Sequence, residues 1–489
     1  MPSFQDITLD ATGSVAGGDG LWRSNVLYGL IGPPVPAYSD RTKLVTAGAA
    51  GGGDGSEVSP WTLAEAMANA VAGDIVGIQA GIYTGTGVST GGRSTPVFQP
   101  ANSGTALNPI TFVAENEALT STSGFTDIRS GLSYPATPAT DLQPAFGGNG
   151  EDYIHWVGIY SSNFDLDNAQ RADSGICTIW NGVGCKVLRC KLLADSARTV
   201  NWADNNFSGV RLENTSGIEI AENLIDGFSI SGGGVNMSGV ISYKSENSNI
   251  HNNTIVDCGN ALQYKASFGT YNNSGLQAYK NLVVDCGQFL RVHALHGGIS
   301  NIYNNGLLGT PILMSSNTAE GVLTQTNIRV FNNTLSGDFE RTVAGLVFIS
   351  IDWVGQGIGT PSGIELFNNI IASCNYYAGS KYITGNSSDV LTDYANYDHN
   401  CQYNNTIVIG IADASSLNWA QWQALSEDVN SITSDPMFVS PSDFHLQAGS
   451  PSLTAGKDVH NFYGGGIGST IPQGAYVTGS EQIGNGVPL

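Results

Sequence analysis

The stretch NIHNNTIVDCG at residues 249–259 carries the pattern on which the fold depends. Polar and apolar residues alternate up to an asparagine, and a short aliphatic run follows. Similar phrases recur along the chain, with 24 to 36 residues between their last asparagines. The phrases are IEIAENLIDG (218–227), LQAYKNLVVDCG (276–287), ISNIYNNGLLG (299–309), NIRVFNNTLSG (327–337) and GIELFNNIIASC (363–374), and VLRCKLLAD (187–195) resembles an earlier, degenerate copy.

A fixed register at this interval is typical of a solenoid, in which each repeat forms one coil. Alternation followed by a turn and a second apolar run predicts two short strands per repeat. No helical segment separates the phrases, so alternating β-α units are not expected. We therefore predict an all-β fold, a right-handed parallel β-helix. Its repeated asparagine would donate and accept hydrogen bonds along the stack and tolerate a left-handed turn.

The composition agrees with this fold and restricts the partners. Of 489 residues, 63 are glycine and only 12% are charged, whereas long amphipathic helices need more charge. The net charge is −22 with 19 lysines and arginines, so we expect no binding to nucleic acid. An acidic polysaccharide would need a local basic patch or bound cations. No run approaches the ~18 apolar residues of a membrane span, so we expect no membrane insertion.

The predicted solenoid covers residues 43–480, between an N-terminal arm or adaptor at 1–42 and a C-terminal tail at 481–489. Ahead of the repeats, DGSEVSPWTLAEAMANAVAGDIVGIQAGIYTG (54–85) predicts a helix followed by a strand. Thr62 and Glu65 form a capping box before an apolar helical stripe. Because a solenoid must cover its terminal coils, we expect this helix to cap the first coil.

The same stretch resembles the opening of pectin-lyase-like right-handed β-helix proteins, where a Pro-Trp segment leads into a helix and then Ala-x-x-Gly-Asp. GTALNPITFVAENE (104–117), SDPMFVSPSDFHLQAGSPSLTAG (434–456) and PQGAYV (472–477) are similar to later segments of that family. The resemblance implies the fold over about residues 43–478. It does not specify a reaction, because this superfamily contains lyases, hydrolases, epimerases and non-catalytic binders.

The seven cysteines follow no metal-binding spacing. Cys177, Cys185 and Cys190 are close enough in sequence for one disulfide, but buried thiols are the favoured interpretation. Cys258 and Cys286 follow the aliphatic residues of successive phrases, which predicts an inward stack of thiols.

A second resemblance concerns chemistry and covers SYKSENSNIHNNTIVDCGNALQYKAS (242–267). This segment is similar to one in chondroitinase B and related alginate lyases, where Lys-Ser opens a coil and an arginine follows one coil later. The resemblance implies that Lys244 is the base of a β-elimination on a uronic acid, with Lys265 in the arginine position. Basic side chains, or Ca²⁺ as the candidate cofactor, would neutralise the uronate carboxylate. Alternatively, the lysines stack merely because they lie one coil apart.

More basic residues follow in FLRVHALHG (289–297), where period two places Arg291 and His293 on one strand face. With His251 they could complete a basic patch. Asp352 and Trp353 interrupt the apolar strand VFISIDWVG (347–355), and the indole offers a sugar-stacking face. The predicted catalytic residues are Lys244, Lys265, Arg291 and His293, and the predicted substrate-binding residues are Tyr264, His296, Asp352 and Trp353.

Hydrolysis by two carboxylates on neighbouring coils is an alternative chemistry. The candidate carboxylates are Asp165, Asp167, Glu213, Glu219, Glu222, Asp226 and Asp352. Aromatic residues in loops, Trp180 among them, could line a glycan groove or pack beneath the loops.

We expect a carbohydrate-recognising or carbohydrate-degrading protein, such as a phage tailspike or receptor-binding depolymerase. Residues 1–42 would then dock on virion tail proteins. The same resemblance implies a homotrimer, in a virion or outside the cell, and no secretory signal is visible after Met1. The alternatives are a secreted monomeric polysaccharide lyase acting on uronic-acid polymers, and a non-catalytic virion adhesin or structural protein.

Overall fold

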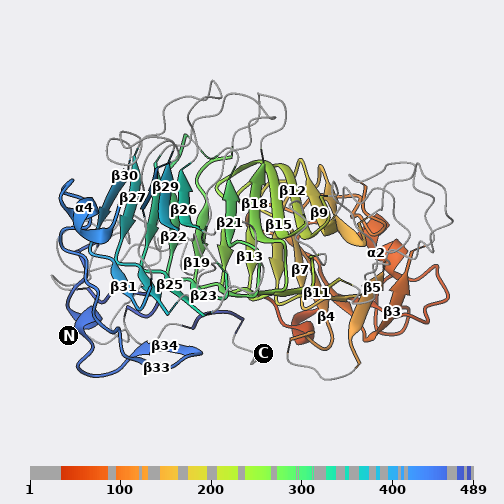
Figure 1. Ribbon diagram of the computed structural model, residues 1–489. Coiled ribbons are helices and arrows are strands. Elements are labelled where there is room, and N and C mark those ends of the chain that lie inside the picture. The colour runs from red at the N-terminus through yellow and green to blue at the C-terminus, as the bar shows by residue number, and fades with distance from the viewer. Residues whose placement is uncertain are drawn as a thin grey trace, which may run out of the picture.

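The chain forms a long stack of β-strand coils, with helix α2 (Leu63–Asn69) near one end and helix α4 (Trp419–Gln423) near the other (Figure 1). The fold is the predicted right-handed parallel β-helix. The computed structural model describes residues 35–85, 95–119, 124–129, 144–162, 175–194, 206–229, 237–265, 273–292, 295, 297–310, 312, 327–337, 347–351, 363–373, 381–385, 395–405, 409–411, 417–459, 471–477 and 482–485.

Three long parallel sheets run along the stack, and within the described residues they have twelve, eleven and six strands. The twelve-stranded sheet contains β1 (Lys43–Val45), β2 (Ile75–Ile78), β4 (Ile110–Ala114), β7 (Ile154–Val157), β10 (Lys186–Leu188), β13 (Glu219–Ala221), β16 (Asn249–His251), β19 (Gln277–Tyr279), β22 (Ser300–Tyr303), β24 (Ile328–Phe331), β27 (Ile364–Phe367) and β30 (Ala395–Asp398). The eleven-stranded sheet contains β3 (Gly81–Thr84), β5 (Thr126–Arg129), β8 (Tyr160–Ser161), β11 (Lys191–Leu193), β14 (Leu224–Asp226), β17 (Thr254–Val256), β20 (Leu282–Val284), β23 (Gly306–Leu308), β25 (Thr334–Ser336), β28 (Ile370–Ala372) and β31 (Cys401–Tyr403).

The six-stranded sheet is the face on which the candidate site lies. It contains β6 (Phe146–Asn149), β9 (Gly175–Trp180), β12 (Ser208–Ser216), β15 (Ser238–Glu246), β18 (Asn260–Lys265) and β21 (Leu290–Val292). A further parallel sheet contains β26 (Val347–Ile351), β29 (Lys381–Gly385) and β32 (Ile409–Ile411), and an antiparallel pair is formed by β33 (Phe438–Ser440) and β34 (Asp443–Leu446).

Each of the two longest sheets places one column of mainly apolar side chains in the centre of the stack. Because successive side chains of a strand point to opposite faces, the middle residue of a three-residue strand points inward here. The column of the twelve-stranded sheet is Val187, Ile220, Ile250, Ala278, Ile302, Val330 and Leu366, and all seven are fully buried. The six described cysteines are buried free thiols, as predicted.

The repeated asparagine forms a continuous ladder inside the turn between the two longest sheets. Asn253 Nδ2 donates to Asn281 Oδ1 at 3.0 Å and to the Ile220 carbonyl at 2.8 Å, and its own Oδ1 accepts from Asn223. The ladder continues through Asn305, Asn333, Asn369 and Asn400. It ends at the buried carboxylate of Asp428, which accepts from Asn400 Nδ2 at 3.0 Å.

The left-handed residue of this turn is not the ladder asparagine but the residue before it, which corrects our expectation. Positive φ occurs at Asn252, Lys280 and Asn304, immediately before Asn253, Asn281 and Asn305. One position thus supplies the turn geometry, and the next supplies the inward amide. A single asparagine does not perform both tasks in this turn.

The predicted capping box is present at the start of α2. Thr62 Oγ1 accepts from the Glu65 amide at 3.2 Å, and Glu65 Oε2 accepts from the Thr62 amide at 2.7 Å. Leu63 and Met67 are buried in the same core as the coils. That α2 closes the first coil remains a prediction.

Segments at both ends of the chain pack on the outer face of the twelve-stranded sheet. Val35 and Tyr38, beside the 3₁₀ turn Tyr38–Asp40, pack against a cluster that includes Val113 and Val157. Near the other end of the chain, after the 3₁₀ turn Pro451–Leu453, Val459 and other C-terminal residues pack on aromatic side chains of later coils. β1 starts at Lys43, but the boundaries and roles of the arm and tail remain predictions. None of the described helices is long and apolar enough to cross a membrane.

Candidate functional site

Two rows of mostly polar or charged side chains lie on the outer face of the six-stranded sheet. Its inward column is apolar and contains Cys177, Val210, Val240, Leu262 and Leu290. The first outward row contains Thr178, Arg211, Ile241, Gln263 and Arg291. The second contains Trp180, Glu213, Tyr243 and Lys265, again on successive strands. Neighbouring strands are ~4.8 Å apart, so side chains of one row are within mutual reach.

Arg211 and Glu213 form an ion pair at the centre of these rows. Arg211 Nε donates to Glu213 Oε1 at 2.5 Å, and Nη2 contacts the same oxygen. The Arg211 side chain is 1% exposed, and Glu213 is also buried. Because both groups are buried, removing one would leave the other as an uncompensated charge with little solvation. The ion pair therefore holds both side chains in place beneath the outer surface of the sheet.

Lys265 reaches the same place from two strands away. Its Nζ donates to Asn206 Oδ1 at 2.6 Å, and Arg211 Nη1 donates to the Asn206 carbonyl at 3.3 Å. The Tyr243 ring lies between these cations, with its centroid 4.7 Å from Arg211 Cζ and 5.9 Å from Lys265 Nζ. Both distances are within the range of a cation–π interaction.

Lys244 and Lys265 do not stack, which contradicts the structural interpretation of their spacing. Lys265 is in register with Tyr243, the residue before Lys244. Lys244 has a φ of 52°, and Asn214 at the matching position of β12 and Asn181 directly after β9 are also left-handed, with φ of 52° and 55°. This left-handed residue interrupts the alternation of the strand, so counting in twos does not give the direction of its side chain.

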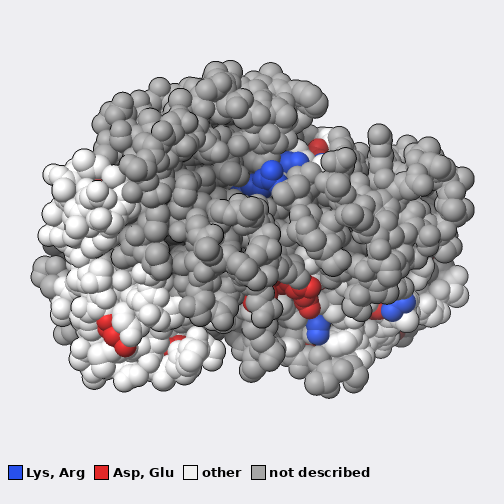
Figure 2. All heavy atoms as spheres, in the orientation of Figure 1, with Lys and Arg blue, Asp and Glu red and all other residues white. Residues whose placement is uncertain are grey.

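Half-exposed side chains lie above the buried layer. Trp180, Tyr243, Lys244 and Arg291 are half-buried, whereas Arg211, Glu213 and Lys265 are buried. Figure 2 shows lysine and arginine side chains gathered at the surface over β12, β15 and β18. A ligand would meet an indole, a phenol and an amine here, on top of buried charges that hold them in place.

Gln263 adds a polar group to the first row, next to Arg291 on β21. Its Oε1 accepts from Ser238 Oγ at 2.8 Å, while its Nε2 is buried and makes no hydrogen bond. Buried amide groups are nearly always paired, so an unpaired one marks strain or a missing partner.

Of the eight predicted site residues, Lys244, Lys265 and Arg291 lie together on this face. Tyr264 is 1% exposed and belongs to the core, so its predicted contact with substrate does not fit this position. The other four lie outside the described residues: His293, His296, Asp352 and Trp353.

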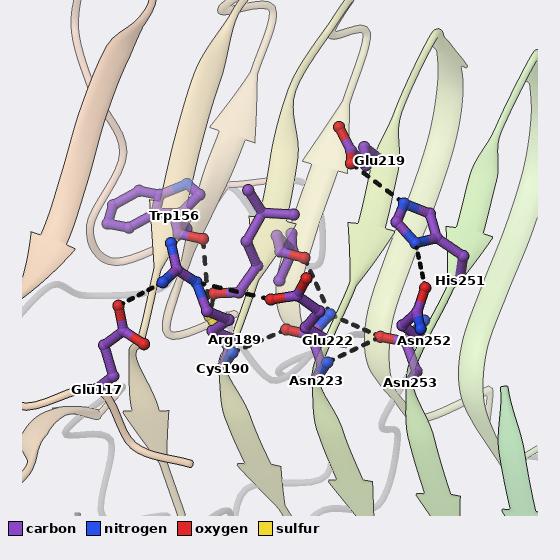
Figure 3. A network of polar contacts seen from close by, with 12 residues as sticks. Glu117, Trp156, Arg189, Cys190, Glu219, Glu222, Asn223, His251, Asn252 and Asn253 are labelled. Carbon is purple, nitrogen blue, oxygen red and sulfur yellow. Dashed lines mark hydrogen bonds and ion pairs between the residues drawn. The ribbon is translucent and has the colours of Figure 1, made fainter. Parts of the chain in front are cut away.

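His251 does not join the basic patch, because it lies on the twelve-stranded sheet. Figure 3 shows its ring between Glu219 and Asn252, with Nε2 3.2 Å from Glu219 Oε1. Lys186 Nζ contacts the other Glu219 oxygen at 2.7 Å. These hydrogen bonds lower the pKa of Glu219 to about 2 against the opposing effect of burial, so this carboxylate is held ionised in a structural network.

The other described carboxylate candidates do not form a hydrolytic pair with Glu213. Glu222 lies in the turn between the two longest sheets, where its Oε2 is 3.8 Å from Arg189 Nε (Figure 3). Asp226 lies on the eleven-stranded sheet. Glu213 is the one carboxylate in the described part of the two outward rows. Among the described residues, no three His, Cys, Asp or Glu side chains are placed to hold a metal ion. The Ca²⁺ prediction therefore remains a prediction.

Sequence reasoning missed Arg211, Asn206 and Tyr243. Arg211 and Glu213 are two residues apart in VRLEN, which is the spacing that places two side chains on one face of a strand. This spacing could have predicted that the two side chains share a strand face. It could not have predicted that they are buried, because burial depends on which segments cover the outer face.

Comparison with known proteins agrees with the fold. No protein-family model matches this sequence. No curated protein matches it either. Among solved structures, pectate lyase Pel9A superposes with a TM-score of 0.53 at 15% identity, covering 89% of this chain and 96% of its own. A polygalacturonase from Erwinia carotovora ssp. carotovora gives 0.46 at 12% identity, covering 78% and 95% of the two chains. The Dettilon tailspike protein gives 0.36 at 12% identity, covering 71% and 60%.

The chain therefore has a pectin-lyase-like right-handed parallel β-helix fold. At these identities the likeness concerns the fold alone. What the protein does has to be inferred from the outer face of the six-stranded sheet.

Proposed function

We propose that this is a carbohydrate-active β-helix protein that binds and cleaves an acidic polysaccharide on the outer face of the six-stranded sheet. One observation supports this proposal above the others: Trp180, Glu213, Tyr243 and Lys265 follow one another on successive strands, with Lys244 at the rim. An aromatic face suits a sugar ring, and basic groups suit its carboxylate. In a chain of net charge −22, a local basic group would attract a polyanion that the rest of the surface repels.

The proposed reaction is β-elimination at a uronic acid. Lys244, as the neutral amine, would take the proton next to the carboxylate, while the bond to the leaving sugar oxygen breaks. Tyr243 would give its hydroxyl proton to that oxygen, and Arg211 and Lys265 would stabilise the negative charge left on the phenol. The products are a chain ending in an unsaturated uronate and a chain with a new hydroxyl end. A single described carboxylate in the rows favours this route over hydrolysis, which uses two.

For the biological setting, we propose a phage tailspike or similar receptor-binding depolymerase, located on a virion or outside the cell. Residues 1–42 would form its attachment segment, and three chains would assemble side by side. The charge-poor composition, rich in uncharged polar residues, supports a surface made for glycans. Particle mass in solution tests this part: three times 51.1 kDa is expected, and 51.1 kDa would favour the secreted monomeric lyase.

The function itself is tested by digesting a panel of polysaccharides, with and without uronic acids. Elimination predicts ultraviolet absorbance from unsaturated products, only with uronans and increasingly at alkaline pH. New reducing ends without that absorbance would show hydrolysis. Binding without cleavage would favour the alternative of a non-catalytic adhesin.

A further inference from the structure

Four asparagines on the outside of the turn between the two long sheets bind the end of the chain. The C-terminal strap, defined here as residues 457–459, 471–477 and 482–485, runs back beside earlier coils, and in Figure 1 the C mark lies below the middle of the stack. Asn368 Nδ2 donates to the Lys457 carbonyl, and Asn332 Nδ2 to the Pro472 carbonyl, each at 2.8 Å. Asn304 and Asn252 repeat this contact with the carbonyls of Ala475 and Gln482, also at 2.8 Å.

These four asparagines are the left-handed residues of their coils. In sequence each is the first of an Asn-Asn pair, while the second asparagine belongs to the inner ladder. Other described coils have a different left-handed residue: Arg189, Glu222, Lys280 and His399. The Asn-Asn pairs therefore mark the coils in which the first side-chain amide donates to the strap and the second belongs to the ladder.

The strap is shaped for this path. The amides of Gly474 and Gly484 donate to the carbonyls of Asn368 and Lys280, each at 2.7 Å. Both glycines have positive φ, and a Cβ on Gly484 would lie 2.9 Å from Leu282 Cβ. Its apolar residues Val459 and Ile471 cover the rings of Phe331 and Phe367. The backbone hydrogen bonds, the apolar contacts and the tight packing of Gly484 against the coil all fix the strap in one position.

We propose that the outer asparagine column is a docking strip for extended peptide, that the C-terminal strap is its occupant, and that the strap docks and releases as a unit separate from the coils. The strap is held by hydrogen bonds at the outer turn and by one small apolar cluster with Phe331 and Phe367, which is separate from the main core. The coils are held by continuous sheets and a buried core. Local units with few buried contacts open at lower free energy than the core.

The test is hydrogen exchange followed by mass spectrometry on the full-length protein. The variant Asn304→Gly/Asn332→Gly keeps a residue that tolerates left-handed backbone but removes two donors to the strap. Exchange of peptides covering 471–485 should become at least tenfold faster, with β22 and β24 unchanged. Lys280→Gly is the control, because it alters the same column without removing a side-chain donor to the strap.

Gly484→Leu provides a second test from the other side, since it blocks close approach without changing a coil. It should also speed exchange in the strap alone. Unchanged strap exchange in both variants would contradict the proposal. Equal loss of protection in strap and coils would contradict it too, because the strap would then not be a separate unit.

Discussion

Lys265 lies in register with Tyr243, and Lys244 follows Tyr243 with left-handed backbone. The two lysines therefore have different environments. Lys265 is buried and bonded to Asn206, whereas Lys244 is half-exposed at the rim. Lys265 is therefore placed to hold its neighbours in position, and Lys244 is placed to contact a substrate.

Replacing Arg211 with methionine should destabilise the protein by about 3–5 kcal/mol, because the buried carboxylate of Glu213 loses its counter-charge. Urea unfolding measures this change. Arg329→Met is the matched control, since its ion pair with Glu365 is partly exposed, and should cost at most about 1 kcal/mol. Equal losses in both variants would mean that the Arg211 pair is not set in a poorly solvated layer.

Removing the Asn281 amide should break the ladder in its middle. Asn281→Ala deletes the bonds to Asn305 Oδ1 and the Ile250 carbonyl and leaves the amide of Asn253 without its acceptor. We expect a loss of about 3 kcal/mol in the free energy of unfolding. Asn301→Ala, which removes one partly buried bond to Gln277, should cost about 1 kcal/mol. A ladder variant as mild as this control would contradict the structural role of the ladder.

Glu427 gives a pH dependence to the C-terminal end of the stack. Burial, with Asp428 adding to it, raises the pKa of Glu427 to about 7 from its ordinary 4.5. The folded state thus holds this proton more tightly than the unfolded state. The contribution of protonated Glu427 to the free energy of unfolding is complete below pH 4.5 and is lost as pH rises through 7. Melting curves of Glu427→Gln should lack this component, whereas Glu57→Gln, at an exposed site, should keep it. Parallel pH profiles for all three proteins would show that Glu427 does not titrate in this range.

Trp180 is expected to stack on a sugar ring. Trp180→Ala should weaken binding of a cleavage-resistant oligosaccharide about tenfold, or about 1.4 kcal/mol, because the row loses its half-buried indole. Titration calorimetry measures the affinity. Trp419→Ala, on α4 at the end of the stack, is the control for loss of a tryptophan elsewhere. Unchanged affinity in Trp180→Ala would place the glycan on another surface.

The repeats were sufficient to predict the coils, because period-two alternation and a recurrent asparagine constrain strand, turn and inward column together. They also located Lys244, Lys265 and Arg291 on one face. The register of Lys265, which pairs with Tyr243 and not with Lys244, could not be predicted, since the intervals between repeats vary and the pattern does not fix the length of one coil to a single residue. The burial of Arg211 and Tyr264 likewise depends on which segments cover each face, and a local pattern does not encode this.

The most direct measurement is the initial rate of uronan cleavage by Lys244→Asn and Lys280→Asn. Both lysines are left-handed, with φ of 52° and 55°, and asparagine fills equivalent positions in neighbouring coils, so neither change should disturb the backbone. Loss of a general base predicts a rate at least about 100-fold lower for Lys244→Asn, with Lys280→Asn at the wild-type rate. Full activity in Lys244→Asn would contradict the proposed site.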